Sequence, residues 1–467
     1  MLVIHESESL TVTLTLHIAQ EELGWHRSGS DVSYKRNDFL YSKPKSSFVR
    51  NFYSLSFNIE FNYDNDTCYM AHCYPYTYTD LCNYLTRLES DANTRKICRR
   101  RLLCRTIANN RCDVLTITAP RTEAEVDADE KDQNGGISMA TAKKPCIVLS
   151  ARVHPGESNA SWMMKGCIDY LTGNSEGAQR LRKQFVFKVV PMLNPDGVIV
   201  GNYRTGLAGT DLNRKWKNPD EDLNPTIFYM KNMMERMRDE RGIVLYVDLH
   251  GHSVKKNAFI YGCDAKFFDA AENHPSREKP VELENRIFPA MLGNKCGMFN
   301  FNDCRFHVKR RKETSGRVVV WRLFTNNSFT LEASFGGADE SHSPPQQHFS
   351  MKTFEQIGID LCQTIEDLMC VPQEERDAKR AAILAQISEI QLDEGDSDDE
   401  GDRGEAAESS DDGSDDDTVE NIVLPKRVDK VRKAKLLGRK KPKAKPPPNP
   451  KKPEDKPQER PAKPLVS

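Results

Sequence analysis

The sequence feature that most constrains the fold is a His-Pro-Gly-Glu turn that directly follows an apolar run. Residues 146–151 read Cys-Ile-Val-Leu-Ser-Ala, and His154 and Glu157 lie just beyond them. A second apolar run, residues 243–249, ends at His250. Each signal alone is weak, and coincidence explains a lone H-x-x-E or a lone histidine. Together they predict zinc at the carboxyl ends of two strands, with one coordination position open for water as in hydrolytic sites.

Length and composition narrow the class of protein. The chain has 467 residues, too many for one ordinary domain, and its 38% apolar content supports a core in part of it. No apolar run reaches the ~18 residues of a membrane span, and the start, M-L-V-I-H-E-S, does not read as a signal peptide. Thirteen cysteines without any C-x-x-C pair predict reduced thiols in a cytosolic protein.

Residues 1–120 are predicted to form an antiparallel β-sandwich domain. Residues 11–16 and 53–61 alternate between apolar and polar side chains, as half-buried strands do. A short helix is expected over 80–88 and a further strand over 113–118. Little sequence precedes Gly24, which is short for such a domain, and a truncated gene model would explain it. Residues 121–144 are polar and predict a linker loop.

Residues 145–372 are predicted to form an α/β domain in which helices cover a mixed sheet. Apolar runs of strand length alternate here with segments of helical spacing, which is the pattern of such a domain. The predicted strands are 146–151, 185–190, 243–249, 259–261 and 317–321, and the predicted helices are 158–171, 221–241 and 354–369.

Residues 373–467 are predicted to be a disordered tail with two opposite charges. Residues 393–420 carry fifteen acidic side chains against one arginine, and residues 426–467 carry sixteen Lys or Arg against four acids. Apolar residues are too few there to form a core. The basic part would attract acidic partners, although a nuclear-localisation or purely solvating role explains it equally well.

Five motifs follow one another along the chain: H-P-G-E (154–157), N-P-D-G (194–197), D-L-N-R (211–214), D-L-H-G-H (248–252) and T-L-E-A-S-F-G-G (330–337). Their order resembles that of the zinc metallocarboxypeptidases. The motif sequences are most similar to those of the cytosolic carboxypeptidases, the branch that trims glutamates from tubulin. The segment Thr67–Tyr78 also resembles that branch's N-terminal β-sandwich domain. The resemblance covers roughly residues 24–368 and implies a mixed-sheet zinc carboxypeptidase domain.

The resemblance assigns a role to each matching residue. It implies one zinc ion on His154, Glu157 and His250, with Asp211 orienting His154 from behind. Glu332 would act as the general base that activates the zinc-bound water and then protonates the leaving amine. The substrate residues would be Arg204, which stabilises the oxyanion, and Asn213 with Arg214, which bind the terminal carboxylate.

Each assignment has a structural alternative. A lone arginine is usually a solvated surface charge, and a glutamate in an apolar run can belong to a buried ion pair. His252 is expected to be a hydrogen-bond partner rather than a fourth ligand. The tyrosine that closes the pocket in the family has no clear counterpart, because the corresponding position holds Arg310.

Specificity is predicted from the segment before Glu332. Counting back as in the pancreatic members places Arg317 at the bottom of the side-chain pocket. A cation there favours an acidic terminal side chain, chiefly glutamate. The basic residues nearby would strengthen the positive field, or would simply form an exposed loop: Arg305, Lys309, Arg310, Arg311 and Lys312.

The predicted function is therefore a zinc carboxypeptidase that removes C-terminal or side-chain glutamates from proteins. The expected partners are glutamylated tubulin, microtubules or other proteins with acidic C-termini, with no need for nucleic acid or membrane. The expected location is the cytoplasm, with the cytoskeleton, centriole or cilium base as further addresses. Two alternatives stay open: an inactive cytoskeletal scaffold, and a zinc deacylase of small amino-acid conjugates.

Overall fold

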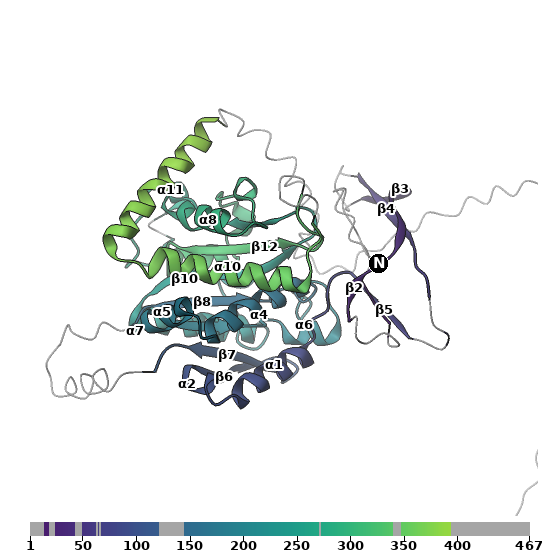
Figure 1. Cartoon of the computed structure of the whole chain (residues 1–467), viewed down its shortest axis with the longest axis horizontal. Helices are drawn as coiled ribbons and strands as arrows, with labels where there is room; N and C mark the ends of the chain where they lie inside the picture. Colours follow the sequence, from purple (N-terminus) through teal and green to yellow (C-terminus); the bar gives the residue numbers. More distant parts are fainter. Residues whose placement is uncertain are drawn as a thin grey trace, which may run out of the picture. The chain divides into compact units, whose positions relative to one another are not determined.

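The computed structural model describes residues 14–17, 24–42, 49–61, 64, 67–120, 144–269, 272–339 and 347–393. Its N-terminal strands form two small antiparallel sheets, β2-β1-β5 and β3-β4 (Figure 1). The antiparallel pairing predicted for this region is confirmed, whereas its arrangement as a sandwich stays a prediction. The strands are β1 (Leu14–His17), β2 (His26–Arg27), β3 (Ser30–Ser42), β4 (Val49–Asn58) and β5 (Cys68–Ala71).

A seven-stranded mixed sheet forms the centre of the molecule. Its order is β11-β12-β10-β8-β9-β7-β6. The four inner strands β12, β10, β8 and β9 are parallel, and β11, β7 and β6 are antiparallel to their neighbours. The strands span Cys98–Arg105 (β6), Arg111–Ile117 (β7), Cys146–Ala151 (β8), Val186–Val190 (β9), Ile243–His252 (β10), Ala258–Tyr261 (β11) and Ser328–Ser334 (β12).

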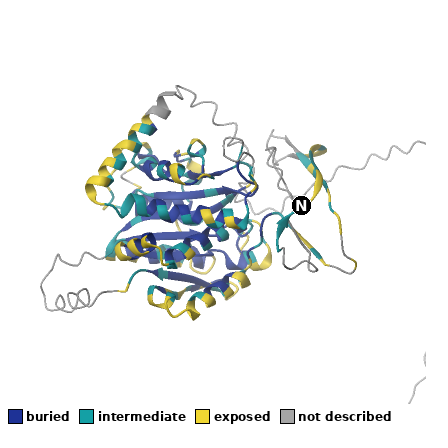
Figure 2. Ribbon diagram, in the orientation of Figure 1, coloured by how far each residue is buried: buried dark blue, intermediate teal, exposed yellow. Residues whose placement is uncertain are grey.

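Helices cover both faces of this sheet. One core cluster joins it to α1, α4, α5, α8 and α10, and a second joins it to α7 and α9. Figure 2 shows the inner strands buried and the outer faces of several helices exposed. The helices are α1 (Tyr78–Ser90), α2 (Thr94–Ile97), α4 (Ser158–Thr172), α5 (Glu176–Gln184), α6 (Pro195–Val200), α7 (Pro225–Arg241), α8 (Glu284–Lys295), α9 (Gly316–Leu323), α10 (Met351–Met369) and α11 (Gln373–Asp393).

The sheet begins earlier in the chain than the sequence suggested. The strand predicted over 113–118 exists as β7, but β7 pairs with β9 and β6 and so belongs to the large sheet rather than to the N-terminal strands. The polar segment 121–144 misled the prediction, because it reads as a boundary between domains. Instead, it connects two strands of one sheet.

The prediction of a strand over 317–321 is wrong, because this segment is the helix α9. Val318, Val319 and Val320 favour a strand by propensity, since β-branched side chains are restricted in helices. Here all residues from Gly316 to Arg322 are buried, so this short helix packs against the rest of the protein on every side. A continuous apolar run is therefore compatible with a helix at this position. Tertiary packing overrides the local preference.

The predicted disordered tail is wrong at its beginning, because residues 373–393 form α11. Two contacts join this helix to α8: Arg380 pairs with Glu284 at 2.9 Å, and Gln386 bonds Asn294 at 3.1 Å. Ile387 of α11 is also buried. The charged composition hid the few apolar positions that pack. The rest of the predicted tail, residues 394–467, lies outside the described residues.

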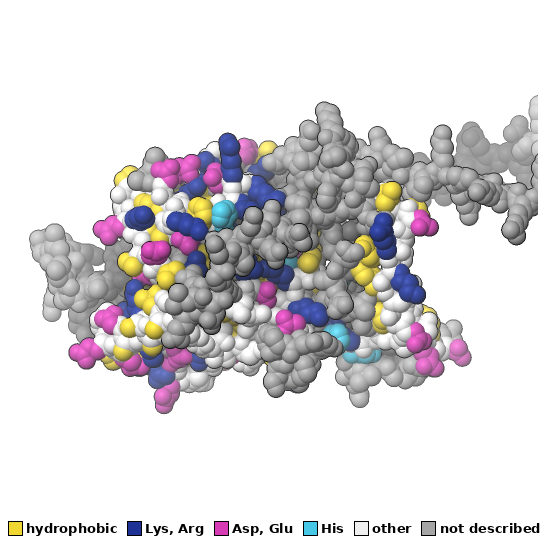
Figure 3. Space-filling model, turned by 90° about the horizontal axis from the view of Figure 1, so that it is seen from above, with side chains coloured by type: hydrophobic (Ala, Val, Ile, Leu, Met, Phe, Trp, Pro, Cys, Tyr) yellow, Lys and Arg dark blue, Asp and Glu magenta, His cyan; other side chains and the backbone are white. Residues whose placement is uncertain are grey.

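The described surface carries both charges. Figure 3 shows Lys and Arg side chains intermixed with Asp and Glu over the part of the face that is described. Cysteines of the core, such as Cys146 and Cys167, are buried thiols outside any disulfide, as predicted. Among the described residues, no helix is both long and apolar enough to cross a membrane.

Two glycines let α4 and α10 pack at backbone contact. A Cβ atom at Gly166 would overlap the carbonyl oxygen of Glu355, and one at Gly358 would overlap that of Met163. Because these neighbours are backbone atoms, they cannot rotate away. α4, which begins at the turn that carries His154 and Glu157, is thereby held against α10.

We predict that Gly358→Ala destabilises the protein by about 1–3 kcal/mol or more, since overpacking a close contact forces the helices apart. Gly297→Ala is the matched control, because Gly297 is exposed and a Cβ there meets nothing within 4 Å. Denaturant unfolding of both variants measures the difference. Equal midpoints for the two would contradict the packing argument.

Candidate active site

The predicted functional residues gather at the carboxyl ends of the parallel strands. His154 lies on the turn after β8, and Glu157 occupies the position that begins α4. His250 lies near the end of β10, whereas Arg204 and Asp211 follow β9. Because the strands are parallel, the segments that follow them meet at one edge of the sheet.

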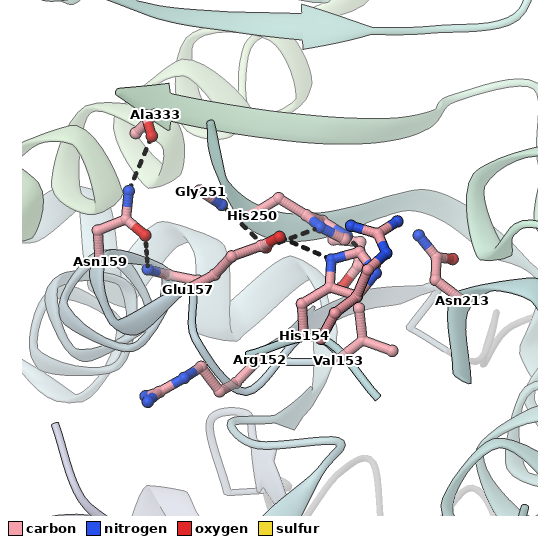
Figure 4. A network of polar contacts seen from close by, with 12 residues as sticks. Arg152, Val153, His154, Glu157, Asn159, Asn213, His250, Gly251 and Ala333 are labelled. Carbon is pink, nitrogen blue, oxygen red and sulfur yellow. Dashed lines mark hydrogen bonds and ion pairs between the residues drawn. The ribbon is translucent and has the colours of Figure 1, made fainter. Parts of the chain in front are cut away.

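The three predicted zinc ligands lie together and are buried. Glu157 is shared by the two histidines: one carboxylate oxygen lies 2.7 Å from Nδ1 of His154, and the other lies 3.0 Å from Nδ1 of His250. The backbone N–H of Gly251 also donates to Glu157 at 3.0 Å (Figure 4). One donor atom from each of the three side chains lies within 4.8 Å of the others.

A carboxylate holds the outer nitrogen of each histidine. Nε2 of His154 lies 3.2 Å from Asp211, and Nε2 of His250 lies 2.7 Å from Asp248. Such carboxylate–histidine pairs fix the ring orientation and the tautomer that a metal needs. Two nitrogens and one carboxylate, each histidine backed by an acid, therefore fit a zinc ion on the Nδ1 side.

The electrostatics of the cluster favour its charged forms. Burial alone would raise the pKa of Glu157, but the two histidines lower it well below its usual range. Burial disfavours a charged His250, yet Asp248 and Glu157 raise its pKa well above the ordinary value. A metal ion must displace that proton, and its positive charge would take the proton's place between the acids.

Asp211 links the histidine to the two arginines that were predicted to bind substrate. Arg204 donates to its carboxylate at 2.9 Å, and Arg214 lies 3.9 Å from it. Burial raises the pKa of Asp211, but His154 and both arginines lower it well below the usual range. The side chain of Asn213, in the same short turn, accepts a bond from the N–H of Gly316 at 2.9 Å.

Glu332 lies beside His250 in the sheet. The two residues are paired in the register of β10 and β12, so their side chains leave the same face of neighbouring strands. On its other side Glu332 is paired with Phe259 of β11. This register places a half-buried carboxylate next to the histidine cluster, as the assignment of a general base requires.

Arg317 lies in the first turn of α9 and is 7% exposed. Its guanidinium donates to the carbonyl of Gly262, contacts Cys263 Sγ at 3.6 Å and lies 5.8 Å above the ring of Tyr261. No described acidic side chain forms an ion pair with it. Arg317 is therefore a buried cation that neutral groups hold in place.

Sequence reasoning missed Asp248 as a site residue. It lies within an apolar run, two positions before His250 and on the same face of β10, where a buried acid needs a partner. One carboxylate oxygen of Asp248 contacts His250, and the other accepts a hydrogen bond from the hydroxyl of Ser150 at 2.7 Å.

His252, predicted to be a hydrogen-bond partner, accepts hydrogen bonds from the backbone N–H groups of Val254 and Lys255. The pocket-closing residue stays unassigned.

Sequence comparison identifies relatives of this chain. Residues 81–356 match the family model of the zinc carboxypeptidases, Peptidase_M14. The chain is 43% identical over 346 residues to cytosolic carboxypeptidase 3 of Mus musculus, covering 74% of this chain and 31% of that protein. It is 42% identical over 373 residues to cytosolic carboxypeptidase 2 of Homo sapiens, covering 80% and 37%. It thus spans about a third of these relatives.

Solved structures share the fold. A metallo-carboxypeptidase of Pseudomonas aeruginosa aligns with a TM-score of 0.56 at 20% identity, over 77% of this chain and 80% of that one. A metallo-carboxypeptidase of Burkholderia cenocepacia aligns with a TM-score of 0.55 at 20% identity, over 76% and 79%. The family model covers more than half of the chain and includes every residue of the cluster. The chain belongs to the zinc carboxypeptidase family, and its relatives are the cytosolic carboxypeptidases.

Proposed function

We propose that this chain is a zinc-dependent metallocarboxypeptidase that removes C-terminal or side-chain glutamates from proteins, with tubulin as its substrate. The observation that carries the proposal is the buried cluster of His154, Glu157 and His250, with Glu332 beside His250 in the sheet. When bound, zinc supplies a Lewis acid and an activated water. The family membership supports hydrolysis of a peptide-type bond.

The chain's own residues divide the remaining work. Glu332 takes the proton from the attacking water and returns it to the leaving amine. Arg204 has a fixed position through Asp211 and stabilises the oxyanion as negative charge develops. Asn213 and Arg214 bind the terminal carboxylate, which makes the enzyme act at chain ends.

Arg317 supports the preference for glutamate. A buried guanidinium without an acidic partner among the described residues leaves a positive charge that only neutral groups compensate. An acidic substrate side chain would neutralise it, and in a desolvated pocket this pairing discriminates strongly against neutral side chains. Glutamate-rich tails of tubulin present this side chain at high density.

The names of the relatives support a location in the cytosol. As partners we propose microtubules and other proteins with acidic C-termini. The centriole and the base of the cilium are further locations in this proposal. The basic stretch 426–467 would hold the enzyme near acidic tails by an attraction that salt weakens.

The metal assignment is tested by His250→Ala. Removing one of two nitrogen ligands should abolish both stable zinc binding and hydrolysis, because no other described group replaces it in the cluster. Zinc content after dialysis is measured by mass spectrometry. His252→Ala is the matched control from the same strand and should keep its zinc. Full zinc occupancy in His250→Ala would refute the ligand set.

The whole proposal is tested with polyglutamylated tubulin, incubated with and without a chelator, followed by mass spectrometry of the tails. We expect loss of glutamates that the chelator stops. Glu332→Gln keeps the shape but cannot accept a proton, so the rate should fall by ~10²-fold or more while zinc content is kept. Unchanged tails with a zinc-loaded wild-type chain would exclude tubulin as the substrate.

Specificity is tested by Arg317→Met on two peptides that end in Glu or Leu. We expect kcat/KM for the Glu peptide to fall by roughly 30-fold or more relative to the Leu peptide, equivalent to about 2 kcal/mol. Arg322→Met is the matched control, since Arg322 is equally buried in α9 but is paired with Glu272 at 2.6 Å. An unchanged preference in Arg317→Met would remove the pocket assignment.

A further inference from the structure

A buried arginine lies directly behind the zinc-binding turn. Arg152 follows β8, is 4% exposed and has a backbone φ of +58°. Glycine adopts this left-handed conformation at no steric cost, whereas other residues are strained in it. Strain that persists in a buried segment must be offset by the contacts around it. The contacts of the guanidinium are therefore informative.

Three elements meet at this guanidinium. Nε donates to the carbonyl of Pro155 at 2.8 Å, and Nη1 donates to the carbonyl of Tyr76 at 3.0 Å and to the hydroxyl of Ser161 at 2.8 Å. Pro155 lies within the turn between His154 and Glu157. Figure 4 shows the Arg152 side chain directed away from the two histidines, on the opposite side of the turn.

Arg152 forms no ion pair with an acidic side chain among the described residues. Its hydrogen bonds go to two carbonyls and one hydroxyl, so none of them neutralises the cation. Burial lowers its pKa to about 10, and the carboxylate of Glu157 opposes that shift. The geometry of the guanidinium is therefore set by these three hydrogen bonds, one of which goes to the turn between His154 and Glu157.

Two further contacts hold the segment that contains Tyr76 against α4. The indole N–H of Trp162 in α4 donates to the carbonyl of Tyr74 at 3.2 Å, and the ring of Tyr76 lies edge-on to Trp162 at 5.1 Å. Residues 72–77, which join β5 to α1, therefore pack against both the turn and the first part of α4. This segment lies before residues 81–356, the part that matches the family model.

We propose that Arg152 is a positioning residue for the metal site, and that it makes zinc affinity depend on residues 72–77. His154 and Glu157 are close in sequence, so their ability to bind one ion depends on the shape of the turn between them. Arg152 fixes that shape through the Pro155 carbonyl, using Tyr76 and Ser161 as its support. The inference rests on the proposed zinc site and adds a determinant outside the ligands.

The test measures zinc dissociation constants of the full chain by competition with a chromogenic chelator. Arg152→Ala and Arg152→Lys should bind zinc about 10–100-fold more weakly, the usual effect of losing a group that orients ligands. Lysine cannot reproduce the forked donors of arginine. Arg152→Gly should be equally weak although glycine suits the backbone, because the guanidinium is what acts.

Arg182→Ala is the matched control. Arg182 is 5% exposed and also donates to backbone carbonyls, those of Leu171 and Gly173, but it lies away from the turn. Its loss should lower the Tm of the zinc-free protein and leave zinc affinity unchanged. A purely structural role for Arg152 would give the same result, so this comparison separates positioning from general stability.

The outcomes distinguish this inference from the proposed function. A wild-type chain that binds no zinc would refute the proposed function. A zinc-binding wild-type chain together with an Arg152→Gly variant of equal affinity would refute the inference alone. If the Arg152 variants fail to fold, Ser161→Ala and Trp162→Phe each remove one support. A weaker zinc affinity in both would uphold the inference, and wild-type affinity in both would overturn it.

Discussion

The sharing of one buried carboxylate by two histidines is the interaction on which the site depends. Glu157 contacts His154 and His250 at once, and Asp211 and Asp248 hold the outer nitrogens of the two rings. The result is a continuous series of acids and histidines drawn from three separate segments. The parallel strands matter because they bring these segments to one edge. The segments at the ends of β8, β9 and β10 each contribute at least one member, so a shift in any register would break the series.

Much of this arrangement was predictable from the sequence. The apolar runs predicted β8 to the residue, β9 to within one residue and β10 except for its last three residues, because central strands of a parallel sheet are buried on both faces. The turn motif predicted His154 and Glu157 as neighbours, the second apolar run supplied His250, and the resemblance supplied Asp211. Local pattern and motif order agree here, as expected where backbone geometry and chemistry are fixed by the same few residues.

The remaining features depend on contacts that no local pattern records. The valines of α9 favour a strand by local propensity, and only their burial in the core accounts for the helix. The helix α11 is anchored by few apolar side chains within a charged sequence. Asp248 and Arg152 were not singled out, because some of their partners, Ser150 and Tyr76, lie far away in sequence. The N-terminal limit of the sheet was misplaced for the same reason, since β7 finds its partner β9 only in three dimensions.

The pairing of β7 with β9 bears on how the chain acquires its structure. Between these strands the sequence inserts β8 and two helices, so the hairpin of β6 and β7 is synthesised well before the strand it joins. Its apolar residues Leu115 and Ile117, both buried in the finished sheet, would stay exposed until β9 arrives. Long-range pairings of this kind slow folding and favour aggregation. Early release from the ribosome, or a break in the chain between these strands, would therefore leave an unpaired sheet edge.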